Sequence, residues 1–146
     1  GLVFIYLVTT SLFRVYPQTL WKDGAGPHES ALSDEDLRLA ERVKGLLEYE
    51  KIYHEPGYGR SELSRELGVS EFQISNVINA YFGKSLPQLI NEYRVADAKN
   101  LLRDTSASIK VIAEETGFNS IATFNRVFRE IAGETPSAYR KNMVKK

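Results

Sequence analysis

The chain contains an internal repeat, which limits its possible folds more than any other feature of the sequence. LSRELG (63–68) matches IAEETG (112–117) at an offset of 49 residues, and ISNVINAYFGKS (74–85) matches FNRVFREIAGET (124–135) at an offset of 50. One additional residue in the second turn accounts for the difference. Each copy has the pattern of a short helix, a glycine turn and a longer helix that ends at Gly83 or Gly133. The repeat therefore predicts two helix-turn-helix units.

Capping patterns mark the starts of several helices. Ser33 precedes Asp36 by three residues in LSDEDL, which is typical of a helix start and predicts a leading helix before the repeat. Ser70 and Gln73 form an S-x-x-Q capping box for the longer helix of the first unit, and Asn119 or Ser120 can cap the longer helix of the second.

A long helix is expected between the two units, in SLPQLINEYRVADAKNLLRD. Its apolar residues recur at helical spacing and predict one continuous buried face, which consists of Leu86, Leu89, Ile90, Tyr93, Ala96 and Leu101. Such a helix is roughly 28 Å long, and successive major-groove faces of B-DNA lie ~34 Å apart. A helix of this length can hold the two helix-turn-helix units over adjacent grooves on one side of a duplex. We call these units the first and second heads.

These patterns predict an all-α fold with two helix-turn-helix subdomains joined by a long connecting helix and preceded by an apolar amino-terminal segment. The expected organisation in chain order is a remnant of a transmembrane or apolar helix (1–21), a linker (22–32), a leading helix (33–57), the first helix-turn-helix unit (58–84), the connecting helix (85–105), and the second unit with a carboxyl-terminal helix (106–146).

The apolar amino-terminal segment begins with GLVFIYLVTTSLF, thirteen residues without a charge. At about 1.5 Å per residue it reaches roughly 20 Å, short of the ~30 Å hydrocarbon core of a bilayer. The positive residues follow the apolar run, unlike those of a signal peptide. We interpret the segment as the end of a transmembrane helix from a longer protein, with Tyr16 and Trp21 at the interface and Arg14 and Lys22 on the cytoplasmic side. Packing of this segment on the soluble domain is the alternative.

Catalysis and metal binding have little support in the sequence. The chain has no cysteine, which excludes disulfides and cysteine nucleophiles. His28 and His54 lack a recognisable nucleophile setting, and together they are two ligands short of a metal site. PGYGR is only a fragment of a phosphate-binding loop. We therefore expect no enzyme activity, no cofactor and no metal.

The second helix of a helix-turn-helix unit enters the major groove of DNA. Asn pairs with adenine and Arg with guanine, each worth ~1–3 kcal/mol of discrimination. The predicted base-reading residues lie off the buried stripe of each longer helix, and they are Phe72, Ser75, Asn76 and Asn79 in the first unit and Ile121, Ala122, Asn125 and Arg126 in the second. The alternative is that these are ordinary solvated residues of a surface helix or of a protein-interaction surface. The near-neutral charge permits this, because residues 60–146 hold only 13 Lys+Arg against 10 Asp+Glu.

Residues 60–141 resemble the DNA-binding domain of AraC/XylS-type bacterial transcription regulators, a homeodomain-like arrangement. The second half of that family has a signature similar to I-x-x-I-A-x-x-x-G-F-x-x-x-x-x-F-x-R-x-F-x-x-x-x-G-x-x-P-x-x-Y-R. This chain matches it with Ile109, Ile112, Ala113, Gly117, Phe118, Phe124, Arg126, Phe128, Gly133, Pro136, Tyr139 and Arg140. The apolar leader, the linker and the approach EKIYHEPGYGRSELSRELGVS further resemble the subgroup whose sensory half is a multi-pass membrane domain.

The resemblance implies a sequence-specific regulator that binds double-stranded DNA. The family's base-contacting positions fall on Phe72, Ser75 and Asn76 in the first unit and on Ile121, Ala122, Asn125 and Arg126 in the second. The family often has Arg at the position of Asn76 and polar residues at those of Ile121 and Ala122. This chain is therefore expected to make fewer hydrogen bonds to base edges, while its apolar side chains can contact thymine methyl groups. Basic or hydroxyl residues near helix ends are assigned to phosphate contacts, and these are Arg60, Ser61, Lys84, Lys110, Ser120, Arg129, Arg140 and Lys141.

Further partners follow from the same resemblance. They are RNA polymerase, a second copy of the chain, and the inner membrane through the amino-terminal segment. The expected location is the cytoplasmic face of the bacterial inner membrane, with control by a sensor domain that lies outside this chain. The alternative is a cytosolic regulator of the same family whose apolar leader belongs to a soluble sensor domain.

Overall fold

The computed structural model describes residues 32–144. The predicted remnant of an apolar helix at 1–21 and almost all of the predicted linker lie outside the described residues. Among the helices of residues 32–144, none combines the length and the apolar character needed to cross a bilayer.

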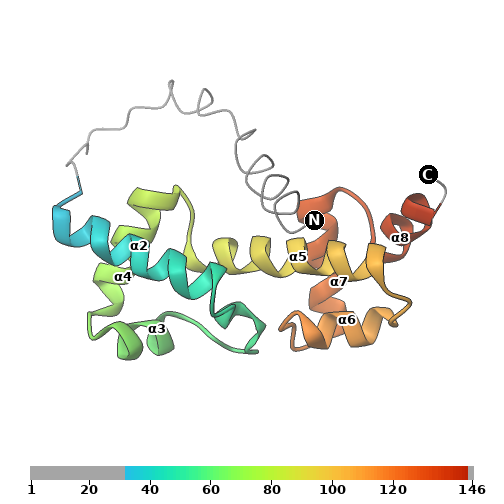
Figure 1. Cartoon of the computed structure of the whole chain (residues 1–146), viewed down its shortest axis with the longest axis horizontal. Coiled ribbons are helices and arrows are strands. Elements are labelled where there is room, and N and C mark those ends of the chain that lie inside the picture. Colours follow the sequence, from blue (N-terminus) through green and yellow to red (C-terminus); the bar gives the residue numbers. More distant parts are fainter. Residues whose placement is uncertain (1–31, 145–146) are drawn as a thin grey trace, which may run out of the picture. The chain divides into compact units, whose positions relative to one another are not determined.

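Seven α-helices and one short 3-10 helix make up the described part of the chain, which contains no strand between residues 32 and 144. In order they are α2 (Asp34–Glu48), η2 (Ile52–His54), α3 (Arg60–Leu67), α4 (Glu71–Phe82), α5 (Leu86–Asp104), α6 (Ile109–Glu115), α7 (Ile121–Ala132) and α8 (Pro136–Val144). The expected all-α class is confirmed. Figure 1 shows α3 and α4 toward one end of α5, and α6, α7 and α8 toward its other end.

Serine side chains cap five of these helices. In each case the hydroxyl oxygen accepts a hydrogen bond from the backbone N–H three residues later, and the capping residues are Ser33, Ser70, Ser85, Ser108 and Ser120. Ser120, rather than Asn119, is therefore the residue that caps α7. The capping box predicted at Ser70 is only half formed, because the Gln73 amide donates instead to Asp36 Oδ1 at 3.5 Å. That contact ties α4 to the first turn of α2.

Two hydrophobic cores lie along α5. The first core is formed by residues of α2, η2, α3, α4 and the first half of α5, among which Val43, Leu63, Ile74 and Ile78 are fully buried. The second core is formed by residues of the second half of α5 together with α6, Phe118 and α7. Each helix-turn-helix unit thus has its own core, and α5 contributes to both.

The predicted buried face of α5 is correct only for its first half. Leu86, Leu89 and Ile90 are buried as expected, but Ala96 is exposed and Leu101 is half-buried. The second half of α5 buries Val95, Ala98 and Leu102 instead. The physical reason is that α5 serves two cores on different sides, so its buried stripe changes direction midway. The single continuous stripe was wrong.

Candidate nucleic-acid interface

The candidate site consists of the outward faces of α4 and α7. The inward faces are anchored by Ile74, Val77 and Ile78 on α4, and by a corresponding trio on α7 that includes the fully buried Phe124 and Phe128. Because helical periodicity places the remaining residues on the opposite side, each longer helix presents its other face to solvent.

The first turns of α4 combine an exposed aromatic ring with polar groups. Phe72 is 75% exposed. Asn76 and Asn79 are exposed, whereas Ser75 is half-buried and its hydroxyl accepts a hydrogen bond from Arg60 Nη1 at 3.0 Å. The guanidinium of Arg60, predicted to contact phosphate, is thus held against the reading face of α4.

A carboxylate also lies near the start of α4. Ser61, another predicted phosphate contact, donates its hydroxyl proton to Glu71 Oε1 at 2.8 Å. Since Glu71 is in the first turn of α4, its negative charge is stabilised there by the helix dipole. A negative charge at this position repels phosphate, whereas the guanidinium of Arg60 attracts it.

The outward face of α7 begins with apolar residues and continues with polar ones. Ile121 is 40% exposed, and Ala122 and Asn125 are exposed. The Arg126 side chain is 63% exposed and its Nη1 forms an ion pair with Glu130 Oε1 at 3.0 Å. Arg129 is exposed beside it. An open hollow next to these residues is lined by Asn125, Arg126, Arg129, Glu130, Thr135 and Ser137.

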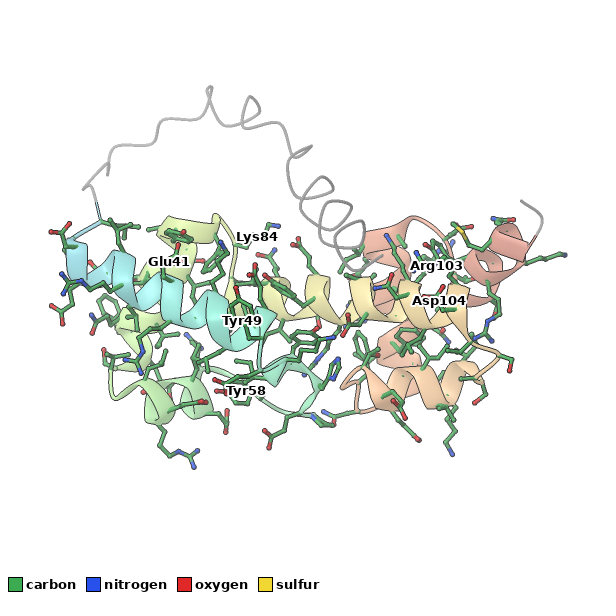
Figure 2. The ribbon with its side chains drawn as sticks, viewed as in Figure 1. Glu41, Tyr49, Tyr58, Lys84, Arg103 and Asp104 are labelled. Carbon is green, nitrogen blue, oxygen red and sulfur yellow. The ribbon has the colours of Figure 1, made fainter. Side chains whose placement is uncertain are left out.

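The remaining predicted phosphate contacts fall into two groups. Lys110 and Lys141 are exposed, and Ser120 is exposed at the start of α7, where it caps the helix. Lys84 forms an ion pair with Glu92, and Figure 2 places Lys84 near the start of α5. Arg140 is half-buried and donates to the carbonyl oxygens of Leu102 at 3.3 Å and Ala107 at 2.6 Å, which gives it a role in holding α8.

Sequence reasoning missed a set of contacts around the middle of α5. Arg94 donates to the backbone oxygen of Tyr53 at 2.7 Å, and Asp97 accepts from the Tyr53 hydroxyl at 2.8 Å. Burial lowers the pKa of Arg94. Burial and the hydrogen bond to Asp97 raise the pKa of Tyr53, and burial with the nearby Glu48 raises that of Tyr93 to about 12. The only available signal was the i, i+3 spacing of Arg94 and Asp97, which places both on one face of a helix.

Within residues 32–144, no group of three or more His, Cys, Asp or Glu side chains is arranged to hold a metal ion. Besides the carboxylates of Glu71 and Glu130, the outward faces of α4 and α7 carry amide, guanidinium, hydroxyl and apolar side chains. These are the groups that contact base edges and phosphates in protein–DNA interfaces.

Comparison with known proteins identifies the family. A sequence model described as a helix-turn-helix domain matches residues 63–142. An uncharacterised HTH-type transcriptional regulator from Staphylococcus aureus is 30% identical over 108 residues, which are 74% of this chain and 14% of that protein. This chain therefore spans only a small part of the length of that relative.

Two solved structures share the fold. The DNA-binding domain of AdpA, a global transcriptional factor solved in complex with a target DNA, is 28% identical with a TM-score of 0.63, covering 71% of this chain and 90% of that one. A transcriptional regulator from Chromobacterium violaceum, described as containing an AraC-type DNA-binding domain, is 27% identical with a TM-score of 0.61, covering 75% and 92%. Since the family model matches more than half of the chain and the fold agrees with these structures, this chain belongs to the helix-turn-helix family and carries an AraC-type DNA-binding domain.

Proposed function

We propose that this domain is the sequence-reading part of a transcription regulator, and that α4 and α7 enter two successive major grooves on one side of a DNA duplex. The observation that carries the proposal is the pair of exposed reading faces held by one helix of 19 residues. Such a helix is roughly 28 Å long, close to the ~34 Å between successive turns of the major groove. The structural similarity to a domain solved with its target DNA supports the same function.

Each proposed reading face has a distinct chemistry. Asn76 and Asn125 are exposed in the first half of α4 and of α7, and Asn pairs with adenine through two hydrogen bonds. Phe72 and Ile121 are exposed apolar side chains in the first turn of the same helices, suited to thymine methyl groups. Both heads therefore favour A·T pairs, and Arg126 is the candidate for a guanine.

Titration of the chain with duplex DNA at 50 and 200 mM salt tests the proposal. The duplex is taken from a selection of bound sequences out of a random pool. Each neutralised phosphate contributes a slope of about −0.9 in log K against log salt, so about four contacts lower the affinity about 100-fold over this range. A protein-interaction module built on the same helices would show no salt-dependent DNA binding, and that result would refute the proposal.

Arg126 and Glu130 give a more local prediction. Replacing Arg126 with Ala is expected to cost ~1–3 kcal/mol of binding free energy and to relax the preference at one base position. Glu130→Gln is expected to strengthen binding up to about fivefold, because it releases Arg126 from an exposed ion pair worth ~0.2–1 kcal/mol and removes a charge that repels phosphate. Binding isotherms on the selected duplex and on single-base variants measure both effects.

A double variant controls this prediction. If Glu130 acts through Arg126, most of the gain from Glu130→Gln disappears in a background that already carries Arg126→Ala. An equal loss on every DNA sequence after Arg126→Ala would instead identify Arg126 as a phosphate contact.

Phe72 carries a separate prediction about thymine. Replacing each thymine of the first half-site in turn with uracil removes only a methyl group, and we expect one such replacement to weaken binding by the wild-type chain several-fold. The same replacement should have no effect on Phe72→Ala, because the ring that meets the methyl group is gone. Fluorescence anisotropy on matched duplexes provides the measurement. Equal sensitivity of both proteins to every uracil would exclude contact between Phe72 and a thymine methyl.

The wider proposal is that a membrane sensor domain outside this chain controls its binding to DNA. Its membrane part rests on the uncharged apolar residues 1–13 and on Arg14 and Lys22, which follow them. RNA polymerase and a second copy of the chain are further proposed partners, which rest on the family resemblance alone. Detergent fractionation of the full-length gene product tests the membrane part. Release of the product without detergent would favour a cytosolic regulator with a soluble sensor domain.

A further inference from the structure

We propose that residues 51–55 form a brace that fixes the separation and angle of the two reading heads, with Arg94 and Asp97 as positioning residues, so that the domain accepts only one spacing between half-sites. The proposal rests on the proposed function, because spacing has meaning only for a protein that reads two half-sites. The brace is the middle of the connection between α2 and α3, includes η2, and lies before the part of the chain that the family model matches.

Arg94 links this brace to the second head. From the middle of α5 its guanidinium donates to the backbone oxygen of Tyr53 at 2.7 Å and to that of Glu55 at 3.1 Å. The same guanidinium lies 5.6 Å from the centre of the Phe118 ring, which belongs to the second core. One side chain therefore connects a segment of the first half with the core of the second.

Asp97, one turn further along α5, holds the other side of the brace. Its Oδ2 atom accepts from the Tyr53 hydroxyl at 2.8 Å, lies 2.7 Å from His54 Nε2, and lies 3.5 Å from Lys51 Nζ. Lys51 adopts a left-handed backbone conformation with φ of 51°, which is uncommon for a residue with a side chain. Three side chains of the brace thus converge on one carboxylate oxygen.

The brace also touches the backbone of the second head. A methyl group on Gly117, in the turn between α6 and α7, would lie 2.3 Å from the oxygen of Tyr53 and 2.9 Å from that of His54. Tyr53 itself is 3% exposed, packs in the first core and stacks on Tyr93. The first head is therefore attached to the second at two places, through α5 and through the brace.

The second attachment determines how much the two heads can adjust. A single helix between two heads can bend, and with 10–10.5 base pairs per turn one inserted base pair rotates the second half-site by about 34°. A domain attached through α5 alone could follow part of that rotation. When the brace holds the turn of the second head, the same rotation breaks the contacts of Arg94 and Asp97. The brace therefore makes the domain selective for one spacing.

Spin labels test the brace without DNA. The chain has no cysteine. The substitutions Ala80→Cys on α4 and Ser137→Cys on α8, both at exposed positions, therefore provide the only two labelling sites. We expect one narrow distance distribution in the otherwise wild-type chain and a clearly broader one after Arg94→Gln. Arg103→Gln, at an exposed arginine near the end of α5, is the matched control and should leave the distribution narrow (Figure 2). An unchanged distribution in Arg94→Gln would overturn the proposal.

Binding to a spacing series tests the consequence for recognition. On the selected duplex, deleting or inserting one base pair between the half-sites should weaken wild-type binding about 100-fold, and should weaken Arg94→Gln less than tenfold. Arg94→Lys should recover part of the selectivity, and affinity for a single half-site should stay the same in all variants. If Arg94→Gln does not fold, Asp97→Asn replaces it in both measurements.

The outcomes separate the two proposals. Absence of salt-dependent DNA binding by the wild-type chain would refute the proposed function, and the spin-label distances would still decide whether the brace fixes the heads. Wild-type binding that tolerates an inserted base pair, or spacing selectivity that is equal in Arg94→Gln and wild type, would overturn the brace.

Discussion

Replacing Gly117 with Ala is expected to lower the free energy of unfolding by about 2–5 kcal/mol. Gly117 has a φ of +94°, a conformation that costs a residue with a side chain about 1–2 kcal/mol. The added methyl group would also lie 2.3 Å from the backbone oxygen of Tyr53 and 3.0 Å from Arg94 Nε. A backbone oxygen cannot move aside as a flexible side chain can, so relieving the clash adds a further ~1–3 kcal/mol.

Gly68 provides the matched control for this prediction. It occupies the equivalent turn of the first unit, has a φ of +69°, and a methyl group added there would meet nothing within 4 Å. Gly68→Ala should therefore show only the backbone cost of about 1–2 kcal/mol. Urea unfolding followed by circular dichroism measures both variants. Similar losses in the two variants would contradict the close approach between the turn of the second head and residues 53–54.

The contrast between these two glycines shows what the sequence could predict. The internal repeat predicted both turns, because a glycine after a short helix is a local signal that needs no tertiary contact. The contact that distinguishes Gly117 from Gly68 is between residues more than 60 positions apart, and nothing in the local pattern of either segment indicates it. For the same reason the hydrogen bond from Arg94 to Tyr53, across 41 residues, could not be predicted.

The connecting helix was predicted in extent but not in packing. Its apolar residues were assigned to one stripe because a helix that covers one core has one buried face. The helix instead covers two cores, so Ala96 is exposed while Ala98 is fully buried. Two short stripes that point in different directions look much like one irregular stripe in the sequence, and only the positions of the two cores distinguish them.

The candidate site was easier to predict in position than in its side-chain partners. Exposure of Asn76, Asn125 and Arg126 follows from the spacing of the buried residues on α4 and α7. The ion pair of Arg126 with Glu130 could be predicted from their i, i+4 spacing. The contacts of Arg140 with two carbonyl oxygens could not be predicted, because they depend on how α8 packs beside the end of α5.

Replacing Phe124 with Ala is expected to unfold the second head while the first head keeps its structure. Phe124 is fully buried in the second core, between Phe118 and Phe128 at ring-centre distances of 5.1 and 5.6 Å. Removing a buried phenylalanine side chain costs about 3–5 kcal/mol. The second core consists of nine buried residues, and none of them belongs to α2, α3 or α4. The loss is therefore confined to the second core.

Hydrogen exchange measured peptide by peptide distinguishes a local from a global effect. Peptides from α6, α7 and α8 should lose protection in Phe124→Ala, whereas peptides from α2, α3 and α4 should keep it. Phe72→Ala is the control, because an exposed ring on α4 contributes within about 0.5 kcal/mol to stability. Equal loss of protection in both heads would mean that the two cores unfold as one unit. Retained protection in the first head would show that the first core, which includes Tyr53 of the brace, is stable without the second core.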